Sequence, residues 1–241
     1  MAAEDVRIEP MSEDFILWRC LHDGPLSKTG IERVPPDGTG PGALQWGRHH
    51  EVNVPLLRKI IRTYGSCAML ARDGEEVVGF LRFYPKALFA LDGAGHMCLQ
   101  QAYPAGPSEV LVEQPFPTLA DMGDRTLSVH CMMTGSPKQE HNPYQRKGIA
   151  TRMVQSLVPW AQAQGWEAIE ATAYEDLDLV YAITGQAGRR FWKRLGFRVT
   201  ARDRLCIEGY DEFVRTMREQ ADAAGLKPDD AQNQYTLRLE L

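Results

Sequence analysis

The spacing of apolar residues divides the chain into strands and helices from its first residues onward. A short strand is expected from Val6 to Glu9. A helix is expected after it, because Ser12 can cap an acidic first turn and because Phe15, Trp18 and Leu21 recur at helical spacing. This beginning predicts a strand followed by a helix that packs on it.

Glycine and proline then interrupt the chain from His22 to Arg48, which is expected to be loop. An apolar face at helical spacing predicts a helix from Val54 to Tyr64. Two strand-like runs, Ser66 to Arg72 and Glu76 to Tyr84, flank Asp73-Gly74, a dipeptide that tolerates the positive φ angles of a tight turn. These runs predict a β-hairpin.

The middle of the chain alternates irregular and periodic stretches. Residues 86 to 124 are broken by many glycines and prolines, and they predict an irregular insertion. The apolar run from Thr126 to Met133 predicts a buried strand, and a helix is expected from Gly148 to Gln164. Pro159 should kink this helix or end it early, since proline removes a helical hydrogen bond.

The last third of the chain keeps this alternation of strands and helices. The expected elements are a strand at Ala168–Tyr174, a helix at Gln186–Leu195, a strand at Phe197–Ala201, a helix at Tyr210–Ala223 and a strand at Tyr235–Leu241. A hairpin followed by alternating helices and strands predicts a single α/β domain over residues 1–241. Its mixed, mostly antiparallel central sheet would be flanked by helices, with the irregular insertion between the third and fourth strands.

Composition narrows the classes of partner and compartment. The 241 residues carry a formal charge of -5 from 27 basic and 32 acidic residues, without long runs of either sign, which argues against nucleic-acid and membrane surfaces. No stretch approaches the roughly 18 apolar residues of a membrane span. Five dispersed cysteines without a C-x-x-C pair argue against a disulfide framework and a structural zinc. We therefore expect a cytoplasmic protein that holds no metal.

One segment has the composition of a phosphate site, at the point where a connector passes into the helix that follows it. It consists of Gln145, Arg146, Lys147, Gly148, Ile149, Ala150 and Thr151. The first turn of a helix has unpaired N–H groups and the positive end of the helix dipole. Small residues at Gly148 and Ala150 admit a pyrophosphate, and two cations flank it. This segment predicts a phosphorylated cofactor. The sequence lacks the P-loop and dinucleotide motifs, which argues against a nucleoside triphosphate and against a dinucleotide.

Two segments are informative when they are taken together. They are Gln145-x-x-Gly148-x-Ala150 and, later in the chain, Phe191-Trp192-Lys193-Arg194-Leu195-Gly196-Phe197. In this order they resemble two signatures of the GNAT superfamily of acetyl-CoA-dependent N-acetyltransferases. The resemblance covers residues 66–200, a cofactor-binding core, and it leaves residues 1–65 and 86–124 as expected acceptor-site elements. It implies a GNAT-like fold and acetyl-CoA as the acyl-donor cosubstrate.

The resemblance also implies where acetyl-CoA would bind and what would follow. The pyrophosphate would lie on the amides from Arg146 to Thr151, and the pantetheine arm beside Met132 and Met133, with Trp192 and Lys193 also near the cofactor. The acetyl group would pass directly, in a ternary complex, to a primary amine of a small molecule or peptide. The sequence leaves a homodimer open, and it does not identify the acceptor.

The proton chemistry departs from the family pattern. Trp192 stands where many relatives have a tyrosine that protonates the departing thiolate, and an indole N–H is not a usable acid near neutral pH. Either Tyr174 or Tyr181 substitutes for that tyrosine, or CoA leaves as a thiolate. The rival to an enzyme is therefore a non-catalytic acyl-CoA sensor or regulatory protein.

The sequence also leaves open which residue acts as the general base. His130 is the titrating group of the strand at residues 126–133, although a histidine there is commonly a hydrogen-bonded core residue. Glu170 and Glu175 are alternatives on and after the strand at residues 168–174. A water relay would need no close base.

Overall fold

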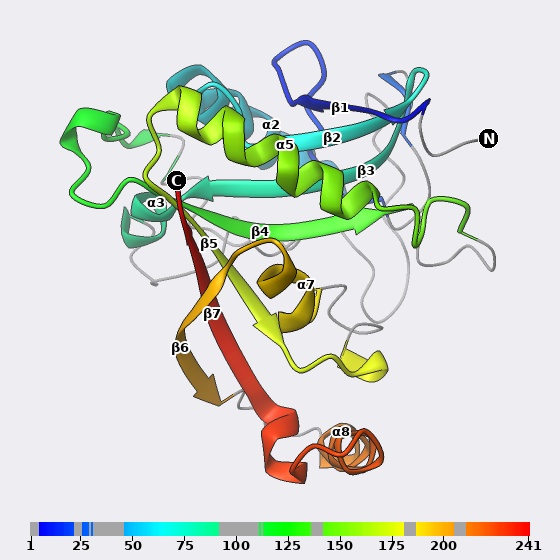
Figure 1. Cartoon of the computed structure of the whole chain (residues 1–241). Helices are drawn as coiled ribbons and strands as arrows, with labels where there is room; N and C mark the ends of the chain where they lie inside the picture. Colours follow the sequence, from blue (N-terminus) through cyan, green and yellow to red (C-terminus); the bar gives the residue numbers. More distant parts are fainter. Residues whose placement is uncertain are drawn as a thin grey trace. The chain divides into compact units, whose positions relative to one another are not determined.

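The computed structural model separates into two compact units, residues Met1–Glu167 and Ala168–Leu241 (Figure 1). Each unit is described by itself. The structure describes residues 5–21, 26–28, 30, 46–91, 111, 113–135, 142–180, 187–204 and 211–241. Tyr181, part of the predicted loop at 22–48 and most of the insertion at 86–124 lie outside these ranges.

The first unit is built on four antiparallel strands in chain order. They are β1 (Arg7–Pro10), β2 (Ala68–Asp73), β3 (Glu76–Pro85) and β4 (Thr126–Thr134). The hairpin between β2 and β3 turns at Gly74, whose φ of 57° is the positive angle that the Asp73-Gly74 pair predicted. Burial of every β3 residue from Val77 to Pro85 makes this strand the centre of the core.

Helices lie on the strands of this unit. They are α2 (Trp46–Tyr64), α3 (Lys86–Leu91) and α5 (Ile149–Gln164), with the short 3-10 turn η2 (Leu119–Asp121). Helix α5 crosses β1 to β4 (Figure 1). The rings of Phe83 and Trp160 lie 5.1 Å apart in this interface, and Ile149, Met153 and Leu157 are buried in it. The helix predicted from Gly148 to Gln164 is confirmed.

The prediction of a helix after Ser12 is wrong. Residues 11–21 follow an irregular path, and every residue from Phe15 to Leu21 is buried. The backbone satisfies its polar groups through side chains instead: Arg82 Nη2 donates to the carbonyl of Leu17 at 2.9 Å, and Asn53 Nδ2 donates to that of Trp18 at 3.2 Å. An amphipathic helix would have left one face in water, so burial on all sides favours the irregular path.

Three further boundaries differ from expectation. Helix α2 begins at Trp46 and contains Pro55, so the predicted loop ends earlier than Arg48 and the helix starts before Val54. Helix α5 runs past Pro159 to Gln164, so this proline does not end it. The insertion opens with α3, a short helix that the glycine and proline count did not predict.

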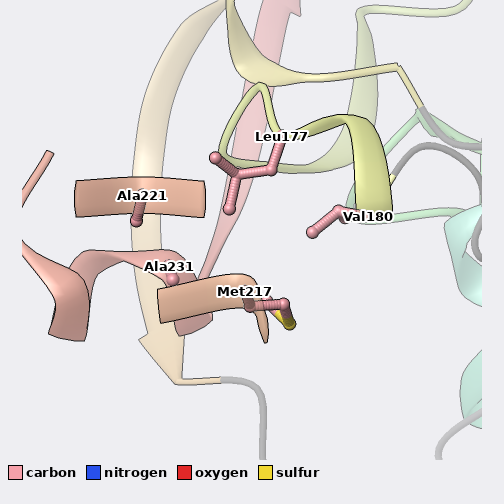
Figure 2. Packing of buried hydrophobic residues seen from close by; sticks show 5 residues of the cluster. All are labelled: Leu177, Val180, Met217, Ala221 and Ala231. Atoms are coloured by element: carbon pink, nitrogen blue, oxygen red, sulfur yellow. The ribbon is translucent and has the colours of Figure 1, made fainter. Parts of the chain in front are cut away.

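The second unit is a three-stranded antiparallel sheet with helices on it. Its strands are β5 (Ala168–Tyr174), β6 (Arg198–Arg204) and β7 (Asn233–Glu240), in the order β5-β7-β6. Helix α7 (Arg189–Arg194) contacts β5 and β7. Helix α8 (Asp211–Ala223) and the 3-10 turn η3 (Pro228–Gln232) build a small apolar cluster with the residues after β5 (Figure 2).

The predicted fold class is confirmed. The strands that pair within each unit are antiparallel, helices flank them, and the insertion lies between the third and fourth strands. None of the helices in the described ranges combines the length and apolar character that crossing a membrane requires.

Candidate functional site

The predicted phosphate site is a turn of two left-handed residues that leads into α5. Arg146 has a φ of 57°, and Gly148, the N-cap of the helix, has a φ of 75°. The first helical hydrogen bond joins the N–H of Arg152 to the carbonyl of Gly148 at 3.0 Å. The backbone N–H groups of Ile149, Ala150 and Thr151 therefore have no acceptor within the helix. They lie at the positive end of the dipole of a 16-residue helix.

Open space surrounds this turn. Residues 145–148 are exposed, whereas Ile149 is buried and anchors the helix start in the core. A Cβ built on Gly148 would meet nothing within 4 Å. Among the residues that the structure describes, no ion pair engages Arg146 or Lys147. The turn can therefore accept a multiply charged anion without first breaking a protein contact.

A hydrogen-bonded scaffold fixes the connector before this turn. Asn142 donates from Nδ2 to the carbonyl of Thr134 at 2.8 Å, and its Oδ1 accepts from the N–H of Tyr144 at 3.0 Å. A Cβ at Gly135 would clash with the side chain of Asn142, and the φ of Gly135 is 66°, so this position favours glycine. Tyr144 Oη donates to Asp73 at 3.0 Å, and burial, with that carboxylate, raises the pKa of Tyr144 to about 12. The connector is thus tied to the end of β4 and to the β2–β3 turn.

A β-bulge on β4 lies at the predicted thioester-binding strand. Pairing with β3 steps from Arg82↔Cys131 to Phe83↔Val129, which leaves His130 as the extra residue. A bulge re-aims the groups of its extra residue, and such irregularities are common beside active sites. The His130 ring lies 5.8 Å from that of Tyr84. Its role as a base stays a prediction.

The rest of β4 offers two predicted cofactor contacts and one thiol. Met132 and Met133 are half-buried and lie opposite Leu81 and Phe80 of β3. A hydrogen bond to Cys20, together with burial, holds the pKa of Cys131 well above its usual range. The Cys131 thiol therefore stays protonated at neutral pH and is a poor nucleophile.

In the second unit, Trp192 is a core residue. It is 2% exposed, and its ring lies 5.1 Å from Phe191 and 5.0 Å from Phe197. Lys193, the next residue, is exposed. Of these two predicted cofactor contacts, only Lys193 presents its side chain to solvent.

The catalytic candidates on β5 share one face of the strand. Glu170 and Tyr174 are both half-buried, and Glu170 forms an ion pair with Arg238 of β7 at 3.1 Å. Burial raises the pKa of Tyr174. Tyr181 lies outside the described residues. Glu170 would have to leave Arg238 to serve as a base, whereas the Tyr174 phenol stays neutral and can donate a proton.

Sequence reasoning missed a buried polar network around Glu175. This carboxylate is 3% exposed, pairs with Arg189 Nε at 2.9 Å and accepts a hydrogen bond from Tyr235 Oη. Asn233 donates to the same Tyr235 oxygen at 3.1 Å. Glu175 is a candidate base from the sequence, and in the structure both Arg189 and Tyr235 engage its side chain. No local signal links residues so far apart along the chain.

The first unit also contains a pocket within the predicted acceptor elements at 1–65. Its volume is about 160 Å³, and it lies between the irregular segment after β1 and helix α2. Its lining consists of Glu13, Asp14, Phe15, Ile16, Trp18, Lys28, His50, Val54 and Arg58. Its part in binding an acceptor stays a prediction.

Comparison with known proteins finds only distant similarities. No protein-family model and no curated protein matches the chain. Among solved structures, it is similar to an apo form of an agmatine N-acetyltransferase mutant, at 13% identity over 98% of this chain and 100% of that one, with a TM-score of 0.48.

Two other solved structures show similarities of the same kind. A GCN5-related N-acetyltransferase from Kribbella flavida is 12% identical over 100% of both chains, with a TM-score of 0.47. Ard1 from Thermoplasma volcanium is 12% identical over 98% of both chains, with a TM-score of 0.44. Similarities this distant say nothing about the substrate or the working residues of this chain.

Proposed function

We propose that this GNAT-like protein is an N-acetyltransferase that moves the acetyl group of acetyl-CoA to a primary amine of a small molecule or peptide. The observation that carries the proposal is the open turn before α5, with left-handed Arg146 and Gly148 and the amides of the first helical turn. These amides bind the pyrophosphate of the cosubstrate, and the exposed Arg146 and Lys147 add charge.

The chemistry of the transfer assigns further roles. The amine loses a proton, attacks the thioester carbonyl through an oxyanion and displaces a thiolate. The pantetheine arm lies beside Met132 and Met133, where a backbone N–H of β4 stabilises the oxyanion. His130 at the bulge is our candidate base, because Glu170 is already engaged by Arg238. Transfer is direct, within a ternary complex.

The test compares two glycines at opposite ends of α5. Gly148 and Gly165 have φ angles of 75° and 87°, and a Cβ on either would meet nothing within 4 Å. Gly148→Glu and Gly165→Glu therefore impose similar backbone strain, about 1–2 kcal/mol. Only Gly148→Glu places bulk and negative charge on the amide turn. Losing two charge-assisted hydrogen bonds, at about 1.5–3 kcal/mol each, weakens acetyl-CoA binding by about 10²–10⁴-fold.

Titration calorimetry measures the affinity of both variants for acetyl-CoA, and their melting temperatures serve as the folding control. We expect Gly165→Glu to bind as the wild type does and Gly148→Glu to bind far more weakly. Equal affinities of the two variants would refute the phosphate site, and with it the cosubstrate.

A non-catalytic acyl-CoA sensor is the second candidate, favoured by the burial of Trp192 in the position of the family tyrosine. It predicts the same calorimetric result. The two functions differ only in turnover, because a sensor binds acetyl-CoA without releasing its thiol.

A further inference from the structure

Arg82 of β3 is a buried cation with no part in the acetyl transfer proposed above. It is 8% exposed, and in the described part of the chain it donates one hydrogen bond, from Nη2 to the carbonyl of Leu17 at 2.9 Å. A guanidinium carries five N–H donors, and the buried Nε of Arg82 has no acceptor. Most of the hydrogen-bonding capacity of this side chain is therefore unused.

The charge of Arg82 has no carboxylate beside it within the described ranges. The titratable groups that interact with this charge are Tyr84 and the thiols of Cys20, Cys67 and Cys131. Burial raises the pKa of Tyr84 and raises that of Cys67 to about 12, while a hydrogen bond to Cys20, together with burial, raises that of Cys131. Tyr84, Cys67 and Cys131 are therefore neutral near pH 7. A buried charge without a counter-charge is costly, and an anionic ligand would offset that cost.

Two contacts hold the guanidinium of Arg82 in place. The carbonyl of Leu17 binds one of its nitrogens, and its central carbon lies 5.1 Å from the centroid of the Phe80 ring. Phe80 precedes Arg82 by two residues in β3, so both lie on the same face of the strand. The donors of Arg82 are thus fixed before a ligand arrives, which lowers the entropic cost of binding one.

Arg82 lies on the same face of the sheet as His130, the candidate base. Cys131 of β4 is the cross-strand partner of Arg82, and such partners share a face. His130, the bulged residue before Cys131, has its ring 5.8 Å from that of Tyr84, which follows Arg82 by two residues in β3. His130 and Cys131 are half-buried, so solvent reaches this part of the face. All of these residues belong to the first unit.

We infer that Arg82 binds the carboxylate of the acceptor and that the amine acetylated by this protein belongs to a free amino acid. This role of Arg82 rests on the proposed acetyl transfer and defines the class of its acceptor. A carboxylate can accept two parallel N–H···O bonds from a guanidinium, and it cancels one positive charge. A phosphate monoester carries about −1.5 to −2 charges at neutral pH and would leave an excess of negative charge beside Arg82.

The position of Arg82 beside the bulge favours a small acceptor. Because His130 is next to the cross-strand partner of Arg82, an amine at this base and a carboxylate on Arg82 are separated by few bonds, as they are in an amino acid. The amine nitrogen bonds to the acetyl carbon and loses a proton to the base, while the carbon–sulfur bond breaks and its electron pair goes to sulfur. The carboxylate is unchanged, and the products are an N-acetyl amino acid and CoA.

The experiment measures kcat/KM for a panel of amino acids, each paired with its own amide, which keeps the amine and lacks the carboxylate. We expect the wild type to prefer the acid by about 10–10²-fold, the worth of a hydrogen bond to a charged group. Arg82→Met fills the space without charge and should remove this preference. Arg82→Lys keeps the charge and should show an intermediate preference. Arg125→Met, the same change of charge at a side chain that is 40% exposed, should keep the full preference.

The ratio of acid to amide separates recognition from folding, because both substrates meet the same variant. Equal kcat/KM for acids and amides in the wild type would remove the carboxylate site and leave acetyl transfer intact. A full preference in Arg82→Met, even with lower activity on both substrates, would show that Arg82 serves only the fold through Leu17. If the wild type acetylates no amine, the proposed function fails. Calorimetry of the same acids and amides would then test the Arg82 site alone, and equal affinities would refute it.

Discussion

At the scale of single residues, the second unit contains a buried charged network around Glu175. Glu175 is 3% exposed, whereas Arg189, its ion-pair partner at 2.9 Å, is 31% exposed. Water therefore screens the cation but hardly reaches the carboxylate. The carboxylate satisfies its oxygens with Arg189 and Tyr235, so removing its charge leaves the network incomplete.

We predict that Glu175→Gln lowers the free energy of unfolding by about 1–3 kcal/mol, because a buried polar network loses its charge. Urea denaturation measures the change. Glu212→Gln is the matched control, since Glu212 is 88% exposed and pairs with Arg215 at 3.5 Å. The control should change stability by less than about 0.5 kcal/mol. Equal stabilities of the two variants would show that the Glu175 network contributes nothing.

Some of these residues could be predicted from the sequence, and others could not. Gly148 and its neighbours were found because a phosphate site at a helix start is a local pattern within seven consecutive residues. The Glu175 network joins β5, α7 and β7, so it exists only after these elements have folded together. The ring contacts of Trp192 with Phe191 and Phe197 are local along the chain, but the burial of Trp192 was not predicted from the sequence.

At the scale of elements, α5 tolerates a proline that was expected to kink or end it. Pro159 lies in an exposed position, and the helix continues to Gln164 with Gly165 as its C-cap. Proline lacks the N–H that would bond the carbonyl of Gln155, but burial of Met153, Leu157 and Ala161 holds the helix on the sheet. Tertiary packing therefore outweighs the local penalty.

We predict that Pro159→Ala raises the free energy of unfolding by about 1–3 kcal/mol, because alanine restores the helical hydrogen bond. Greater freedom of the unfolded chain offsets roughly 0.4–1 kcal/mol of the gain. Acetyl-CoA affinity should not change, since Gly148 lies at the other end of the helix. Gln162→Ala is the control, because it shows how much the helix propensity of alanine alone changes the stability. A less stable Pro159→Ala protein would mean that the proline ring itself stabilises the helix.

Helices and strands whose apolar residues recur at a regular spacing could be predicted from the sequence, whereas buried irregular segments could not. The β2–β3 hairpin, β4, α5 and β5 follow their apolar patterns closely. The segment after Ser12 has apolar residues at helical spacing, yet all its residues from Phe15 to Leu21 are buried. Arg82 and Asn53 satisfy its carbonyls from distant elements, and no local pattern contains that information.

At the scale of the whole molecule, the residues that carry the proposed cofactor binding lie in the first unit. This unit contains the amide turn before α5 and the bulged strand β4. The single domain expected over residues 1–241 stays a prediction. The acceptor could not be read from sequence, because glycine- and proline-rich stretches have no period from which a binding surface follows.

The central claim is that the protein transfers acetyl groups, and turnover tests it most directly. The measurement follows free thiol released from acetyl-CoA across a broad panel of primary amines, with mass spectrometry of the amines. We predict thiol release that depends on the amine and equals the amount of acetylated product. Tight acetyl-CoA binding without thiol release for any amine would contradict the claim and identify a sensor.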